Sequence, residues 1–133
     1  MKSVEISINE ALNQAIVAQK AGDFQKAKSY YMAILEGSPD HPDVNHNMGV
    51  LVYATGKVDQ AIKFFENAIN GNANIPQYWL SYINMLIEQN RMDEAKKTFE
   101  RAFEKGVTRD PFDEIKQKLG KADSYEKHPT DSS

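Results

Sequence analysis

The chain has 133 residues, 41% of them hydrophobic and 26% charged, which is typical of one soluble globular domain with a modest core. Its 16 Lys and Arg residues against 19 Asp and Glu give a net charge of −3, so no broad basic surface is expected to attract nucleic acid. It has no cysteine, which excludes disulfides, thiolate metal ligands and thiol catalysis. No apolar run is long enough for a signal peptide or a membrane span, which predicts a cytoplasmic protein without membrane contact.

One short pattern recurs three times along the chain. The segments are AGDFQKA at residues 21–27, TGKVDQA at 55–61 and QNRMDEA at 89–95, so each lies 34 residues after the one before. An aromatic residue follows the last alanine of each segment by four positions, as Tyr31, Phe65 and Phe99. A fixed period of this length predicts a stack of similar supersecondary repeats.

Each repeat is predicted to be a helix, a tight turn and a second helix. In chain order, the repeats span residues 8–41, 42–75 and 76–109. The turns are placed by Gly22, Gly56 and Asn90, because glycine and asparagine most readily adopt the left-handed backbone that ends a helix. In the second helix, the small alanine is expected to admit the partner helix and the aromatic residue to fill the space beside it.

A short helix at residues 111–119 is predicted to cover the third repeat. Asp110 followed by Pro111 is a favourable N-cap and first-turn pair. The apolar residues that would face the repeat are Phe112, Ile115 and Leu119. The three repeats and this cap are expected to form a single domain over residues 1–120. Residues 121–133 have no periodicity, which predicts a disordered tail or a linker.

This pattern resembles the tetratricopeptide repeat family, whose 34-residue signature carries Trp, Gly, Tyr, Ala, Phe and Pro at set positions. The second repeat matches at Gly49, Gly56, Ala61, Phe65 and Ala68. The third repeat matches at Trp79, Ala95, Phe99 and Ala102. The first repeat keeps Gly22, Ala27, Tyr31 and Pro39, but has Ala11 and Ala15 where the family has tryptophan and glycine. The resemblance implies an all-α fold, an α-α superhelix (solenoid) of three helix-turn-helix repeats plus the capping helix.

Two segments also resemble bacterial repeat modules that stand N-terminal to larger enzymes. They are VNHNMGV at residues 44–50 and the segment at residues 79–107. This second resemblance implies fusion to glycosyltransferases like O-linked N-acetylglucosamine transferase, to sulfotransferases or to methyltransferases.

In the family, ligands contact the inner, concave face of each repeat's first helix. The resemblance therefore implies partner contacts at Asn9, Leu12, Asn13, Ile16, His46, Asn47, Val50, Tyr53, Leu80, Ser81, Asn84 and Ile87. Asn13 and Asn47, followed by Ser81 and Asn84, are similar to an asparagine ladder that holds an extended peptide backbone through amide groups. The alternative is that these side chains are hydrated or bond between helices.

Six of these positions carry apolar side chains: Leu12, Ile16, Val50, Tyr53, Leu80 and Ile87. Together they would form a patch for an apolar peptide or for a second copy of the chain. The alternative is that the register is displaced by one position and several of them belong to the core.

The expected function is a non-catalytic scaffold that binds a peptide or a partner protein. A substrate-docking module of a larger transferase and a self-assembling homo-oligomer are the alternatives. His41, His46 and His128 lack metal-ligand spacing and no Gly-rich phosphate loop is present, so no metal, cofactor or catalytic residue is expected. Chaperone-tail receptors of this family bind acidic C-terminal tails through Lys, Asn and Arg. Tight binding of such tails is not expected, because the equivalent positions are Leu12, Ile16, His46, Val50, Leu80 and Asn84.

Overall fold

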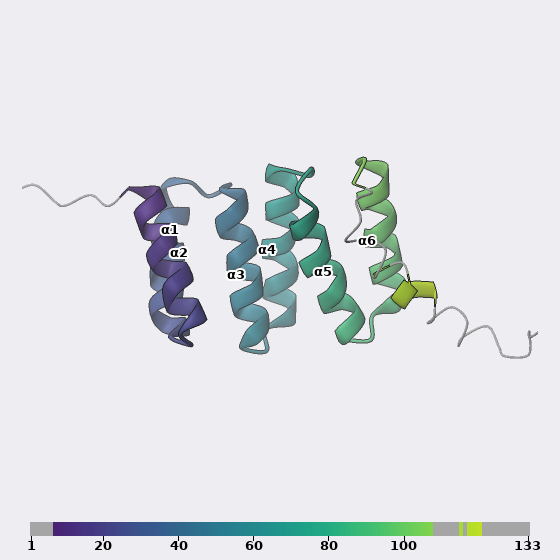
Figure 1. Cartoon of the computed structure of the whole chain (residues 1–133), viewed down its shortest axis with the longest axis horizontal. Helices are drawn as coiled ribbons and strands as arrows, with labels where there is room; N and C mark the ends of the chain where they lie inside the picture. The colour runs from purple at the N-terminus through teal and green to yellow at the C-terminus, as the bar shows by residue number, and fades with distance from the viewer. Residues whose placement is uncertain (1–6, 108–114, 116, 121–133) are drawn as a thin grey trace, which may run out of the picture. The chain divides into compact units, whose positions relative to one another are not determined.

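The computed structural model describes residues 7–107, 115 and 117–120 of the chain. The chain divides into two compact units, Met1–Gly71 and Asn72–Ser133, and each is described by itself. The helices of the first unit are α1 (Ile8–Lys20), α2 (Phe24–Gly37), α3 (Pro42–Ala54) and α4 (Val58–Gly71) (Figure 1). Those of the second unit are α5 (Pro76–Glu88) and α6 (Met92–Glu104). Every regular element in the described residues is helical, which confirms the predicted all-α fold.

The turn inside each repeat is the one that the sequence predicts. Gly22, Gly56 and Asn90 have positive φ angles of 84°, 87° and 61°. The residue after each of them donates its backbone N–H to a carbonyl five positions earlier, at 2.8 to 2.9 Å, in the pairs Asp23 to Ala18, Lys57 to Val52 and Arg91 to Leu86. This bonding satisfies the last carbonyls of the first helix and reverses the chain.

The helices of the first unit pack in sequence, with α1 against α2, α2 against α3 and α3 against α4. Ala27 and Ala61 have no exposed surface, and the aromatic rings of Tyr31 and Phe65 are equally buried. A Cβ atom at Gly49 would lie 2.7 Å from the Phe65 ring. The glycine therefore allows the ring to pack against the backbone of α3, and the predicted role of the alanine and aromatic pair is confirmed in these two repeats.

The second unit fills the same positions differently. Ala95 is again fully buried, but Ile83 occupies the position of Gly49 and is itself fully buried. Phe99, at the position of Phe65, is only half-buried. Its ring instead stacks on Phe103, with centroids 6.1 Å apart and planes inclined by 28°. The expectation that the aromatic residue fills the core is therefore incomplete for the third repeat.

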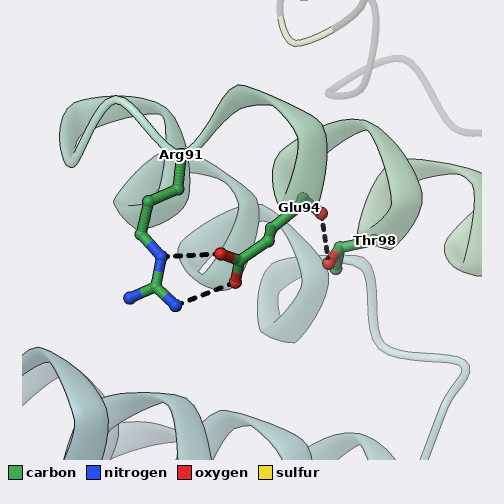
Figure 2. A network of polar contacts seen from close by, with 3 residues as sticks. All are labelled: Arg91, Glu94 and Thr98. Atoms are coloured by element: carbon green, nitrogen blue, oxygen red, sulfur yellow. Dashed lines mark hydrogen bonds and ion pairs between the residues drawn. The ribbon is translucent and has the colours of Figure 1, made fainter.

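Polar contacts between neighbouring residues hold the start of α6 (Figure 2). Arg91 Nε and Nη2 donate to the two carboxylate oxygens of Glu94, each at 2.9 Å. Thr98 Oγ1 donates to the backbone carbonyl of Glu94 at 2.8 Å. The ion pair lies in solvent, so it orders the first turn of α6 but adds little to stability.

The predicted cap at residues 111–119 lies partly outside the described residues. Residue 115 and residues 117–120 are helical, and Ile115 and Leu119 are buried as expected for a cap. The predicted start of this helix at Asp110 and Pro111 and the predicted tail at residues 121–133 lie outside the described residues.

Replacement of Gly49 by alanine is expected to lower the free energy of unfolding by about 1–3 kcal/mol, because the added methyl group overpacks the Phe65 ring. Urea denaturation followed by circular dichroism measures this change. Gly37→Ala is the matched control, since Gly37 is also helical and an added Cβ there meets no atom within 4 Å. Equal unfolding midpoints for Gly49→Ala and Gly37→Ala would contradict the packing described here.

Candidate functional site

The twelve residues predicted to contact a partner lie on α1, α3 and α5. All of them are half-buried or exposed. Buried residues of the same helices include Ala11 and Ala15 on α1, Met48 and Leu51 on α3, and Tyr82 on α5. None of the twelve residues therefore belongs to the fully buried core. Their contact with a partner stays a prediction.

The first unit contains a pocket of about 450 Å³ at the meeting of its first three helices. Its lining residues are Ile16, Gln19 and Lys20 from α1, Phe24 and Tyr31 from α2, and Asn47 and Ala54 from α3. Two of them, Ile16 and Asn47, are predicted contact residues. The volume falls in the range of ligand pockets, about 300–1,000 Å³. This pocket is the candidate functional site.

A polar cluster forms one side of the pocket. The Tyr31 hydroxyl donates to Gln19 Oε1 at 2.6 Å, which joins α2 to α1. Burial raises the pKa of Tyr31 to about 12, and a hydrogen bond with the Asn47 side chain acts in the opposite direction. The phenol is therefore protonated at neutral pH. It presents a fixed hydroxyl between two amide groups.

His46 lies beside this cluster on α3. Its Nδ1 is 3.1 Å from Asn47 Oδ1, so the Nδ1–H tautomer donates to the amide oxygen. Its ring is 5.9 Å from that of Phe65, which packs beneath it from α4. Burial lowers the pKa of His46, although the hydrogen bond with Asn47 and the negative charge of Asp43 both act to raise it. The imidazole is therefore held in its neutral form.

Most of the predicted asparagine column is engaged within the chain. Asn47 contacts His46 and Tyr31, as described above. On α5, Ser81 Oγ accepts from Gln77 Nε2 and Asn84 Oδ1 accepts from Lys118 Nζ, each at 3.3 Å. Asn13 is exposed and lines a separate hollow of about 390 Å³ with Glu10, Gln14 and Tyr30. The contacts of Ser81 with Gln77 and of Asn47 with His46 lie within one helix, whereas that of Asn47 with Tyr31 joins α3 to α2.

Five pocket residues are absent from the predicted set, namely Gln19, Lys20, Phe24, Tyr31 and Ala54. Phe24 and Tyr31 lie on α2, whereas the prediction is confined to the first helix of each repeat. The sequence signal for Tyr31 was its hydroxyl, because a phenylalanine stands at the same position in the other two repeats. A buried tyrosine usually finds a partner for its hydroxyl. Nothing in the spacing pattern identifies Phe24.

Two kinds of feature are absent from the described residues. No group of three or more His, Cys, Asp or Glu side chains in that part of the chain is placed to hold a metal ion. Over the same residues, no helix has the length and apolar character needed to cross a membrane.

Family models and solved structures identify what this chain is similar to. Models of the tetratricopeptide repeat match residues 18–81 and 77–111. The first such repeat domain of Spaghetti (RPAP3), solved bound to the HSP90 peptide SRMEEVD, is 17% identical with a TM-score of 0.74, covering 86% of this chain and 94% of that one. The Yersinia enterocolitica type III secretion chaperone SycD, in complex with a peptide of the translocator YopD, is 17% identical with a TM-score of 0.71, covering 89% and 92%.

A third similar structure is a mutant of MamA, which is 21% identical with a TM-score of 0.62 and covers 73% of this chain and 71% of that chain. At these identities the likeness of the solved structures shows the fold. None of the three is described as a transferase, so the resemblance to modules of larger transferases stays a prediction.

The stability of the chain is expected to fall when the pH drops below about 6.5, the usual pKa of histidine, because His46 has a lowered pKa in the folded state. The unfolded chain binds the proton more readily there, so acid favours unfolding, and the contribution is complete only above pH 6.5. Urea denaturation between pH 5 and pH 7.5 measures it. His46→Gln is the control that cannot titrate. Parallel pH profiles for the two proteins would contradict the burial described here.

Proposed function

The chain belongs to the tetratricopeptide repeat family, and on this premise we propose that it is a non-catalytic scaffold that binds a peptide segment of a partner protein. The proposed binding surface in the first unit is the face of α1 and α3 with the pocket at their junction with α2. One observation carries the proposal, namely the pocket that combines apolar walls with a fixed group of hydrogen-bonding side chains.

The chemistry of this pocket suits an extended peptide. Ile16, Phe24 and Ala54 offer apolar surface for one side chain of the peptide. Gln19 and Asn47 offer amide groups, which donate and accept hydrogen bonds in the way that a peptide backbone requires. Burial of a few anchoring side chains in such pockets supplies most of the energy in many protein interfaces. We therefore expect one apolar anchor, with the backbone on either side held by amides.

The proposed surface includes further exposed and half-buried residues in each unit. In the first unit they are Asn9, Leu12, Asn13, Ile16, His46, Asn47, Val50 and Tyr53. In the second unit, α5 offers a further set of proposed contacts, which are Leu80, Ser81, Asn84 and Ile87. These residues are accessible without unfolding, and six of the twelve are apolar, as a peptide-binding face requires.

Two of the similar structures support this proposal. The Spaghetti domain holds an HSP90 peptide and SycD holds a peptide of YopD. Peptide capture is therefore compatible with this fold. A single domain over residues 1–120 and a cytoplasmic location are parts of the same proposal.

The first test uses Ile16→Glu, which places a carboxylate on the apolar wall of the pocket. Peptides selected from a random library on the wild-type protein are expected to bind Ile16→Glu at least about tenfold more weakly, which calorimetry resolves as about 1.4 kcal/mol. Light scattering on the wild-type protein shows whether a second copy occupies the surface instead.

Met32→Glu is the matched control, because Met32 is an exposed apolar residue on α2 that does not line this pocket. It should leave peptide affinity unchanged. Selected peptides that lose affinity for Met32→Glu but keep it for Ile16→Glu would place the binding surface elsewhere. Circular dichroism confirms that both variants keep their helices.

Acidic C-terminal tails are expected to bind weakly. The predicted clamp positions carry Leu12, Ile16 and Val50 on α1 and α3, and these side chains cannot pair with a carboxylate. A calorimetric titration with the peptide SRMEEVD, which the Spaghetti domain binds, tests this. Tight binding that weakens steeply with added salt would contradict the expectation, because such salt dependence marks charge pairing.

A further inference from the structure

One pair of equivalent positions, with one member on each helix of a repeat, carries different side chains in the three repeats. The pairs are Ala11 with Ala33, Asn45 with Asn67, and Trp79 with Arg101, and each pair lies 34 residues after the one before. In the second repeat, Asn67 Nδ2 donates to Asn45 Oδ1 at 3.4 Å. In the third, the Arg101 guanidinium lies 5.4 Å from the centre of the Trp79 ring. In the first repeat both members of the pair are alanine.

The first member of the pair also ties its helix to the preceding loop. Trp79 Nε1 donates to the carbonyl of Ala73 at 2.8 Å, and Asn45 Nδ2 donates to that of Pro39 at 3.0 Å. In both cases the acceptor lies six positions earlier. Ala11 has no group that can donate in this way. The large side chain and its hydrogen bond are thus both missing from the first repeat.

A pocket of about 430 Å³ lies at this place in the first repeat. Its lining residues are Ile8 and Ala11 from α1, Tyr30, Ala33, Ile34 and Gly37 from α2, and Ser38. Ala11 and Ala33 are both among them, so the pocket lies at the pair that an indole and a guanidinium fill in the third repeat. None of these residues lines the α1–α3 pocket described above.

We propose that this second pocket binds the indole side chain of a tryptophan presented by a partner polypeptide. The same repeat geometry holds an indole in the third repeat, where Trp79 is fully buried. Ile8, Ile34 and the Tyr30 ring provide apolar surface, and the Ser38 hydroxyl is a candidate acceptor for the indole N–H. The one tryptophan among these 133 residues is Trp79, which is itself fully buried, so these residues offer no accessible indole to the pocket.

The proposal concerns a site that is separate from the peptide surface of α1 and α3. It needs only the open, mainly apolar pocket between α1 and α2. The Ile16→Glu variant should therefore leave this site intact. Failure of the peptide proposal and failure of this one can be told apart.

The probe is N-acetyltryptophan amide, which carries the indole on a short piece of backbone. Saturable changes are expected in the methyl NMR signals of Ala11, Ala33 and Ile34 of the full chain. N-acetylleucine amide should bind at least about tenfold more weakly than N-acetyltryptophan amide, because it lacks the ring. Ala11→Trp places an indole in the pocket from α1 and should abolish the response to the probe.

Val17→Trp is the matched control, because Val17 lies on the same helix with 64% of its surface exposed and outside the pocket. It should retain the full response. If Ala11→Trp does not fold, Ala33→Phe fills the pocket from α2 and should have the same effect. The proposal is overturned if the wild-type protein does not respond to the probe. Filling of the pocket by its own chain or by a second copy would give this result. The proposal is also overturned if Ala11→Trp and Ala33→Phe respond to the probe as strongly as the wild-type protein does.

Discussion

The close approach of the two helices in each repeat is the contact on which the rest of this structure depends. It occurs at Ala27, Ala61 and Ala95, and none of these side chains has any exposed surface. A larger residue there would overpack the contact between the helices that the left-handed turns at Gly22, Gly56 and Asn90 connect. This contact buries one side of the first helix of each repeat, so the opposite side is more accessible. The proposed peptide surface lies on that opposite side.

The fold could be predicted from sequence because its signals are local and repeat at a fixed spacing. Asn90 shows this most clearly, because only its place in the repeat marks it, among the asparagines of the chain, as a turn residue. Asn45 was not recognised as the counterpart of Trp79, because an amide and an indole share no hydrophobic signal. They share a hydrogen-bonding role instead, which only the positions of the loop carbonyls reveal.

The candidate site could be predicted only in part. The contact positions that the family resemblance implies on α1, α3 and α5 are half-buried or exposed, because burial follows helical spacing. The sequence pattern did not show that Asn47 is engaged with His46 and Tyr31, since these contacts depend on how α2 and α3 pack together. The half-buried state of Phe99 does not follow from its place in the repeat, since the equivalent Tyr31 and Phe65 are fully buried.

The two pairs of the first unit, Ala11 with Ala33 and Asn45 with Asn67, imply that its two repeats differ in local stability. In a repeat array each repeat contributes its own stability and that of its contacts with neighbours. The Asn45 and Asn67 pair braces the second repeat, whereas Ala11 and Ala33 leave the first without such a brace. Local opening of α1 and α2 should therefore cost less free energy than opening of α3 and α4, and amide hydrogens should exchange fastest at this end of the unit. A ligand bound in the pocket beside Ala11 and Ala33 would slow that exchange, so ligand binding would be coupled to local rigidity of α1 and α2.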